Sequence, residues 1–256
     1  MISRSYFTRR ADSVGVDAKT VERDYVLTHV LAGICLQQGS ERMAFKGGTA
    51  LRLCFFEDYR YSADLDFSLI DGMTIADASE LVSNALIALE KSHAFPLLEL
   101  NADASRVDYI GPLGRRRNVK LDLATDELVL NTEGVPLLSR YEDQPRVDVV
   151  AYTLDEVAAE KLRCVIQRVQ ARDLFDLHQL FVERGVDVDT VWLDFERKTR
   201  HKRIDPARFP EMYERRLPAW ESRWDDEMEA HVPTELRPHF GAVKREVTRA
   251  LRSHLG

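Results

Sequence analysis

The chain has 256 residues, of which 45% are hydrophobic, so it can form one large domain or two modest domains around a substantial core. Its formal net charge of −7 argues against a surface coated in basic charge for nucleic acid, although a local basic groove is compatible with it. The longest apolar run is too short to span a bilayer, and no signal peptide is predicted at the start. We therefore expect a cytoplasmic protein with no membrane partner.

The cysteines and histidines indicate neither disulfides nor a zinc site. Cys35, Cys54 and Cys164 are scattered among apolar residues, which is typical of buried free thiols in a reducing compartment. The seven histidines never pair with cysteines at the spacing of zinc ligands.

The first part of the chain mixes helical and extended patterns. Apolar residues recur at helical spacing over residues 20–37, and Thr74 is a suitable cap for another amphipathic helix. Between these helices, extended patterns at 42–46 and 61–70 flank two glycines and a short helix that we expect to open at Thr49. Further extended segments are predicted at 97–100, 106–110, 117–123 and 147–152.

The second part of the chain has only helical patterns. Residues 153–156, Thr-Leu-Asp-Glu, form a capping-box sequence for a long helix that runs towards Ala171, and Asp173 is predicted to begin the next helix. Pro206, Pro218 and Pro233 stand where the first turns of helices would begin. The sequence therefore predicts an α+β domain over residues 1–152 and an all-helical domain over 153–256. Because no linker rich in Gly, Ser or Pro separates them, we expect the two to pack together.

Two carboxylates share one face of the predicted strand at 61–70. Side chains two residues apart lie on the same side of a strand, so Ser62, Asp64 and Asp66 oppose Leu65 and Phe67. The Cβ atoms of the aspartates stand ~7 Å apart by the strand rise. Two bare carboxylates this close repel each other, and a divalent cation removes the repulsion. Hard oxygen ligands suit Mg²⁺ or Mn²⁺.

The stretch Lys46-Gly47-Gly48-Thr49 precedes this strand at a strand-to-helix turn. Glycines let a backbone approach an anion closely, and the N–H groups of the helix start would face phosphates, to which Thr49 can add a hydroxyl. Phosphate at the turn and metal at the aspartates would then share one nucleoside triphosphate. Asp122, on a neighbouring strand, is a third candidate ligand that would allow a two-metal site.

Each of these motifs also has an ordinary interpretation. Gly-Gly is common in turns, and an Asp-x-Asp pair on a surface strand is usually only solvated. The conjunction of the two motifs on consecutive elements favours a functional site.

The segment 46–49 followed by Arg60, Ser62, Asp64 and Asp66 resembles the signature of the AbiE-type (AbiEii/AbiGii) nucleotidyltransferase toxins. This group includes the MenT toxins and belongs to the polymerase-β-like nucleotidyltransferase superfamily. A second similarity lies in the helical part, in AAEKLRCVIQRVQARDLFDLHQL, and a third near the start, in VERDYVLTHVL. Residues after Val191 carry no motif of this kind.

The resemblance implies a small mixed sheet followed by a helical domain that completes the active-site cleft. It implies a toxin that transfers a nucleotide from an NTP, with CTP or UTP favoured, to the 3′ acceptor end of tRNA and so blocks aminoacylation. A cognate antitoxin would be its partner. The resemblance makes Asp64 and Asp66 metal ligands, Lys161 a contact of the triphosphate, and either Asp173 or Asp176 the residue that completes the site. The residues implied in nucleotide binding are Lys46, Gly47, Gly48, Thr49, Ser62 and Lys161.

The residues of the helical part also allow other roles. Lys161, Arg168 and Arg172 share one helical face, and such a basic stripe is most often a solvated surface. Asp173 is also a plausible N-cap, with Asp176 three residues further on.

Two basic clusters could contact RNA phosphates, although charge runs usually mean only a wet surface. They are Arg115, Arg116, Arg117 with Lys120, and Lys198, Arg200, Lys202 with Arg203.

Ser62 is a candidate for regulation, because the resemblance implies that in some relatives the antitoxin is a kinase-like protein that phosphorylates this kind of serine, while in others the antitoxin only binds. The alternative is a small polar residue tolerated beside a metal. Two further functions stay open: nucleotidylation of a protein or small-molecule hydroxyl, and an inactive binding module. The intact Asp64 and Asp66 speak against the inactive module.

Overall fold

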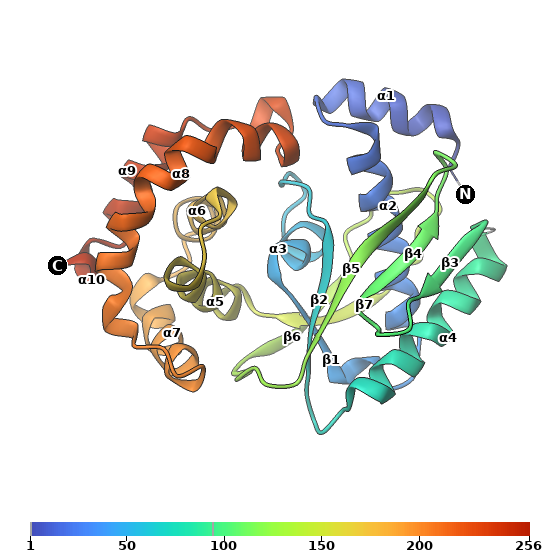
Figure 1. Cartoon of the computed structure of the whole chain (residues 1–256), viewed down its shortest axis with the longest axis horizontal. Helices are drawn as coiled ribbons and strands as arrows, with labels where there is room; N and C mark the ends of the chain where they lie inside the picture. Colours follow the sequence, from blue (N-terminus) through green and yellow to red (C-terminus); the bar gives the residue numbers. More distant parts are fainter. Residues whose placement is uncertain (1, 94) are drawn as a thin grey trace. The chain divides into compact units, whose positions relative to one another are not determined.

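The structure is a computed structural model of the chain and describes residues 2–93 and 95–256. The contacts divide the chain into two units (Figure 1). Unit 1 holds Met1–Asp126, Thr132–Ala151 and Pro233–Glu235, and unit 2 holds Glu127–Asn131, Tyr152–Val232 and Leu236–Gly256. The predicted domains were continuous in sequence, whereas the two units exchange short segments.

Unit 1 is built on a seven-stranded sheet with the strand order β3-β4-β5-β2-β1-β7-β6. β2 pairs antiparallel with β1 and parallel with β5, and β1 pairs parallel with β7, so the sheet is mixed. The strands are β1 (Met43–Lys46), β2 (Asp64–Leu69), β3 (Leu97–Leu100), β4 (Arg106–Ile110), β5 (Arg116–Ala124), β6 (Thr132–Pro136) and β7 (Asp148–Tyr152). The predicted α+β class with a small mixed sheet is therefore confirmed.

Three helices of unit 1 pack in sequence order against one another and the sheet. They are α1 (Arg4–Val14), α2 (Ala18–Cys35) and α4 (Ile75–His93). α1 packs on α2, α2 on α4, and α4 on β3. Figure 1 shows α2 and α4 on the same side of the sheet. The remaining helical segments are short: η1 (Ser40–Arg42, a 3₁₀ turn), α3 (Gly47–Ala50) and η2 (Leu51–Phe55, a π-helical turn).

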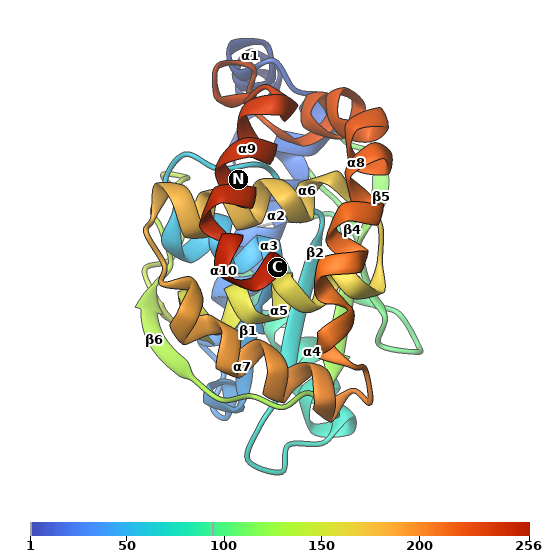
Figure 2. The ribbon, with the colours of Figure 1, turned by 90° about the vertical axis from the view of Figure 1, so that its left-hand side faces the viewer.

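Unit 2 is all helical, as predicted. Its segments are α5 (Leu154–Gln167), α6 (Ala171–His178), η3 (Gln179–Glu183), α7 (Val188–His201), η4 (Pro206–Arg208), α8 (Phe209–His231), α9 (Phe240–Ala250) and α10 (Arg252–Leu255), while η5 (Thr234–Leu236) falls at the division between the units. α5 packs on α7, and α8 packs on both α5 and α6. In Figure 2 the long α8 runs past α6 and α5. None of the helices within the described residues has the length and apolar character that crossing a membrane requires.

One of the three proline predictions is wrong. Asp205 caps η4 with Pro206 at its first position, as expected, and Pro233 directly precedes η5. Pro218, in contrast, lies inside the 23-residue helix α8. Proline removes one backbone hydrogen bond from a helix, which costs local stability. Trp220 and Trp224 of the same helix are 0% and 2% exposed, and the burial of these side chains offsets that cost.

The predicted capping box is only half formed. The hydroxyl of Thr153 accepts a hydrogen bond from the Glu156 N–H at 3.2 Å, which makes Thr153 the N-cap of α5. The Glu156 carboxylate does not reach back to the cap. It accepts from the Leu130 N–H at 3.1 Å and pairs with the ammonium of Lys198. Lys198 is only 1% exposed, so the prediction that it contacts RNA is wrong in this structure.

Candidate active site

β2 presents Asp64 and Asp66 on one face, as its alternation predicts. Both aspartates are half-buried, whereas Leu65 and Phe67 between and after them are buried. In the register of the sheet, Asp66 lies opposite Lys46 of β1 on one side and opposite Asp122 of β5 on the other. The three strands therefore bring Lys46, Asp66 and Asp122 into one row.

Asp122, the third candidate metal ligand, forms an exposed ion pair. The ammonium of Lys120 donates a hydrogen bond to its carboxylate at 3.2 Å. Burial lowers the pKa of Lys120, but the Asp122 carboxylate and the nearby Asp66 and Asp64 raise it above its ordinary value overall. Within the described residues, no three His, Cys, Asp or Glu side chains converge into a group that could hold a metal ion. Asp64 and Asp66 therefore stay the first candidate ligands, and the role of Asp122 in a two-metal site stays a prediction.

The contacts of the two glycines explain why the turn needs them. Gly47 has a φ of +75°, and a Cβ there would lie 2.9 Å from Oδ2 of Asp66. A Cβ on Gly48 would lie 2.1 Å from Nη2 of Arg60. A carboxylate and a guanidinium therefore pack directly against the backbone of the turn, where any larger residue would displace them. The helix also begins at Gly47, two residues earlier than predicted.

Thr49 joins the turn to β2. Its side chain is almost fully buried, and its hydroxyl donates to the backbone carbonyl of Asp64 at 2.5 Å. The same hydroxyl lies 2.7 Å from that of Ser62, which is half-buried. The predicted contact of the Thr49 hydroxyl with phosphate is therefore not supported, because that hydroxyl is used to position the strand that carries the aspartates.

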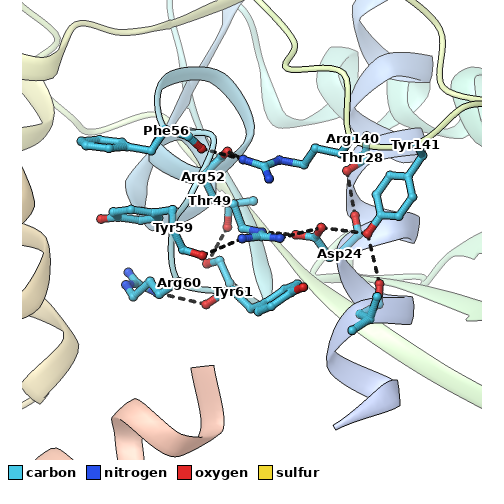
Figure 3. Close-up of polar contacts among 12 residues, drawn as sticks. Asp24, Thr28, Thr49, Arg52, Phe56, Tyr59, Arg60, Tyr61, Arg140 and Tyr141 are labelled. Atoms are coloured by element: carbon cyan, nitrogen blue, oxygen red, sulfur yellow. Dashed lines mark hydrogen bonds and ion pairs between the residues drawn. The ribbon is translucent and has the colours of Figure 1, made fainter. Parts of the chain in front are cut away.

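A buried ion pair behind the turn was not predicted from the sequence. Arg52 of η2 forms two hydrogen bonds with the Asp24 carboxylate of α2 and donates a third to the Tyr59 carbonyl at 2.7 Å (Figure 3). Burial alone would raise the pKa of Asp24, but Arg52, Arg140 and a hydrogen bond from Tyr141 lower it overall. In the sequence, the charged Arg52 within the otherwise apolar run 50–56 is the feature that could have indicated a buried ion pair.

Arg140 fixes the other end of the same segment. Its guanidinium donates to the carbonyl of Phe56 at 2.6 Å and of Glu57 at 3.0 Å, and also to that of Arg52. These carbonyls belong to η2 and to the two residues that follow it. Together Asp24, Arg52 and Arg140 hold the segment between the glycines and Tyr61 (Figure 3).

Unit 2 contains the second group of candidate residues as a buried ion cluster. The ammonium of Lys161 lies 3.0 Å from Asp173 and 2.5 Å from Asp176, and all three residues are at most 5% exposed. Arg168 adds two hydrogen bonds to Asp173, at 2.8 and 2.9 Å. Burial raises the pKa of Asp173, but Lys161 and Arg168 lower it below its ordinary value overall. Lys161 is therefore no part of a solvated stripe. Asp173 is no N-cap either, since that position belongs to Gln170.

The family model of the nucleotidyl transferase AbiEii toxin, from type IV toxin–antitoxin systems, matches residues 29–246 of this chain. The chain belongs to this family. It is a nucleotidyltransferase toxin, and membership implies an antitoxin partner. The match spans both groups of candidate residues, from the glycine turn to Asp176.

Two solved structures resemble this AbiEii family member. MenT4, a nucleotidyltransferase toxin from Mycobacterium tuberculosis H37Rv, is 21% identical with a TM-score of 0.58, over 98% of this chain and 88% of that one. At this identity the match supports the fold. An antigenic nucleotidyltransferase-like protein from Paracoccidioides brasiliensis is 14% identical with a TM-score of 0.39, over 67% of this chain and 88% of that one. Among curated protein sequences, none matches this chain.

Most members of the two basic clusters are engaged with carboxylates in this toxin. The ion pairs are Arg116 with Glu99 and Asp108, Arg117 with Glu22, Lys120 with Asp122, Arg200 with Glu196, and Lys202 with Glu127. Across the described part of the chain, no carboxylate lies within ion-pair distance of Arg115 or Arg203. The contact of these clusters with RNA thus stays a prediction. Arg115 and Arg203 are the cluster residues whose charge no nearby carboxylate compensates.

Proposed function

We propose that this toxin transfers a nucleoside monophosphate from CTP or UTP to the 3′ acceptor end of tRNA, in the cytoplasm, and thereby blocks aminoacylation. The observation that supports this most directly is the contact between the Asp66 carboxylate and the backbone of Gly47. It supports the proposal because the Asp66 carboxylate lies close to the turn at which we propose that the triphosphate binds.

The residues present fit a Mg²⁺ ion that arrives with its nucleotide. Mg²⁺ is commonly held by one or two carboxylates together with substrate phosphates and waters, and Asp64 and Asp66 are half-exposed carboxylates on one strand face. When bound, the ion would neutralise the triphosphate and polarise the phosphorus under attack. Arg60, packed on Gly48 and only 2% exposed, would add positive charge at the turn without contacting the phosphates directly.

The transfer itself needs few groups. The 3′ hydroxyl oxygen forms a bond to the α-phosphorus, the bond from that phosphorus to the bridging oxygen breaks, and pyrophosphate leaves while the hydroxyl proton passes to solvent. Asp64 and Asp66 orient the nucleotide, and Thr49 and Ser62 keep their strand in place. The contact of Lys161 with the triphosphate stays a prediction, since its ion pairs also give it a structural role.

The test is to incubate the purified protein with each α-labelled NTP, Mg²⁺, and either total RNA or protein extract. Label in tRNA supports the proposal. Label in protein or a small molecule would point to the alternative acceptor, and no label in any arm would favour an inactive binding module.

Substitutions at the carboxylates test the metal assignment. Asp64→Asn and Asp66→Asn are each expected to reduce transfer by at least roughly 100-fold, because the charge that holds the metal nucleotide is lost. Neither should strongly destabilise the chain, since both side chains are only half-buried. Asp122→Asn is the matched control and should keep most activity. Loss of activity in Asp122→Asn alone would contradict the assignment.

A further inference from the structure

A second candidate site lies in unit 1, apart from the Asp64–Asp66 face. A pocket of about 510 Å³ opens between α1, α2, η2 and the segment 138–141. Ligand pockets commonly measure about 300–1,000 Å³. Its lining residues are Tyr6, Arg10, Val21, Asp24, Arg52, Glu57, Tyr61, Leu138, Ser139, Arg140 and Tyr141. None of the residues predicted to bind metal or nucleotide is among them.

The floor of the pocket is electrically neutral. Asp24 and Arg52 are 1% and 5% exposed and form two hydrogen bonds with each other. The Asp24 carboxylate also accepts from the Tyr141 hydroxyl at 2.9 Å. Arg52 is therefore its ion-pair partner, and its charge also attracts the nearby Arg140.

Two further arginines bring positive charge without a carboxylate partner. Within the described residues, no carboxylate lies within ion-pair distance of Arg10 or Arg140. Arg140 donates only to backbone carbonyls, and its Nε is buried without any hydrogen-bond partner. Burial and the neighbouring Arg52 lower its pKa. Glu57 is the opposing charge in the lining, and it is exposed. A bound anion would compensate the excess positive charge.

Aromatic rings complete the walls. Tyr6, Tyr61 and Tyr141 line the pocket, and the half-buried Tyr6 offers the accessible ring, because Tyr61 and Tyr141 are only 2% and 6% exposed and the Arg52 guanidinium already stacks over Tyr61 at 3.8 Å from its centroid. Tyrosine and arginine planes are the surfaces on which flat rings such as nucleobases stack. From the arginines, the rings and the volume together, we infer that this pocket binds an organic monophosphate with a planar group, of the size of a nucleoside monophosphate.

The inference does not depend on the proposed tRNA reaction. The pocket shares no residue with the Asp64–Asp66 face. Two of its lining residues, Arg52 and Tyr61, nevertheless belong to the segment that leads from Thr49 to Ser62 and follows the glycine turn (Figure 3). A ligand in this pocket would therefore contact Arg52 and Tyr61 of that segment.

The test is calorimetric titration of the full chain with uridine 5′-monophosphate, and separately with inorganic phosphate and with uridine. We expect the monophosphate to bind more tightly than either fragment, because only it uses both the arginines and the rings. Inorganic phosphate binding as tightly as the monophosphate would overturn the role of the tyrosines. Absence of monophosphate binding would overturn the site.

Two variants on α1 locate the binding. Arg10→Glu should weaken the affinity at least about 5-fold, since it reverses a charge at the pocket. Arg9→Glu is the matched control: it is exposed, adjacent and outside the pocket, and it should bind as the parent chain does. Equal affinities of the two variants would overturn the inference. An Asp66→Asn variant should also bind normally, and loss of binding there would place the ligand in the active site instead.

Discussion

The two glycines of the turn are required by side chains that come from elsewhere in the chain. Position 47 requires glycine because its backbone is left-handed and because Asp66 lies close to it. Position 48 requires glycine because the Arg60 guanidinium occupies the volume that a side chain would fill. The sequence predicted close approach of a ligand to these glycines. The structure shows that two charged protein groups, the Asp66 carboxylate and the Arg60 guanidinium, already approach them.

Gly48→Ala should therefore destabilise the chain by about 1–3 kcal/mol, because the new methyl group displaces the buried guanidinium. In an Arg60→Ala background, Gly48→Ala should lower the free energy of unfolding much less, so the effects of the two substitutions should not add. Urea unfolding of the four chains measures this coupling. Gly134→Ala is the control, since a Cβ there meets nothing within 4 Å. Additive effects of the two substitutions would show that Arg60 is not what excludes a side chain at Gly48.

Ser62 is held by Thr49, and this contact bears on the regulatory hypothesis. Ser62→Ala should keep most transfer activity, because Thr49 still donates to the Asp64 carbonyl. Ser62→Glu should abolish transfer, because it adds negative charge beside Asp64 and Asp66 in place of a hydroxyl. Intact mass spectrometry after co-expression with the antitoxin shows whether a phosphate is attached there. Full activity of Ser62→Glu would remove the electrostatic basis of such a switch.

Elements with a strong local pattern were predicted from the sequence, and elements defined by distant contacts were not. β3 and β4 have the predicted bounds, and β1 and β7 differ from them by one residue. α1 was missed because only Phe7 and Ala11 of its residues are buried, and two apolar positions one turn apart are too short a pattern to identify a helix. β6 was missed because only Val135 is buried in it.

The same division holds for the candidate site. Asp64, Asp66 and the glycines stand in one short stretch, so their proximity follows from strand and turn geometry. The network of Asp24, Arg52 and Arg140 joins residues up to 117 positions apart, counting the Tyr141–Asp24 hydrogen bond, and no local pattern encodes such pairs. Likewise, the sequence placed Lys161 on a basic face but could not show that Asp173 and Asp176 enclose it.

The buried cluster of unit 2 gives a prediction about pH. The folded-state pKa of Asp173 lies below its ordinary value of 3.8, so its ion pairs stabilise the fold fully above that pH and are lost as the pH falls through the folded pKa. Asp173→Asn should cost roughly 3 kcal/mol at pH 7, because Arg168 loses its carboxylate and Lys161 one of two. Its free energy of unfolding should then fall less than that of the parent chain between pH 7 and pH 3.

Tryptophan fluorescence during urea unfolding isolates this unit. The three tryptophans, Trp192, Trp220 and Trp224, all belong to unit 2. Asp155 serves as the control carboxylate on α5, since its pKa is raised by burial and nearby acids rather than lowered. If the free energy of unfolding of Asp173→Asn falls as much as that of the parent chain between pH 7 and pH 3, the ion pairs of Asp173 are not the source of the pH dependence.

For the whole molecule, the balance of charge limits how a polyanion can bind. The chain has 43 acidic and 36 Lys or Arg residues, and ion pairs compensate most of the basic clusters that seemed suited to RNA. An RNA substrate would therefore meet a mostly negative protein with a few uncompensated cations. Its affinity should depend on few phosphate contacts and should fall only moderately with salt.

Arg115 is the residue at which this expectation can be measured. Arg115→Gln should weaken tRNA binding and reduce the slope of log affinity against log salt by roughly 0.7–0.9, the value expected for one lost phosphate contact. Arg9→Gln removes the same charge from another exposed arginine of unit 1 that has no ion-pair partner among the described residues, so it controls for net charge. It should leave the slope unchanged. Equal slopes for the two variants would mean that the cluster at 115–120 lies outside the RNA contact, and that its arginines serve the ion pairs with Glu22, Glu99 and Asp108 alone.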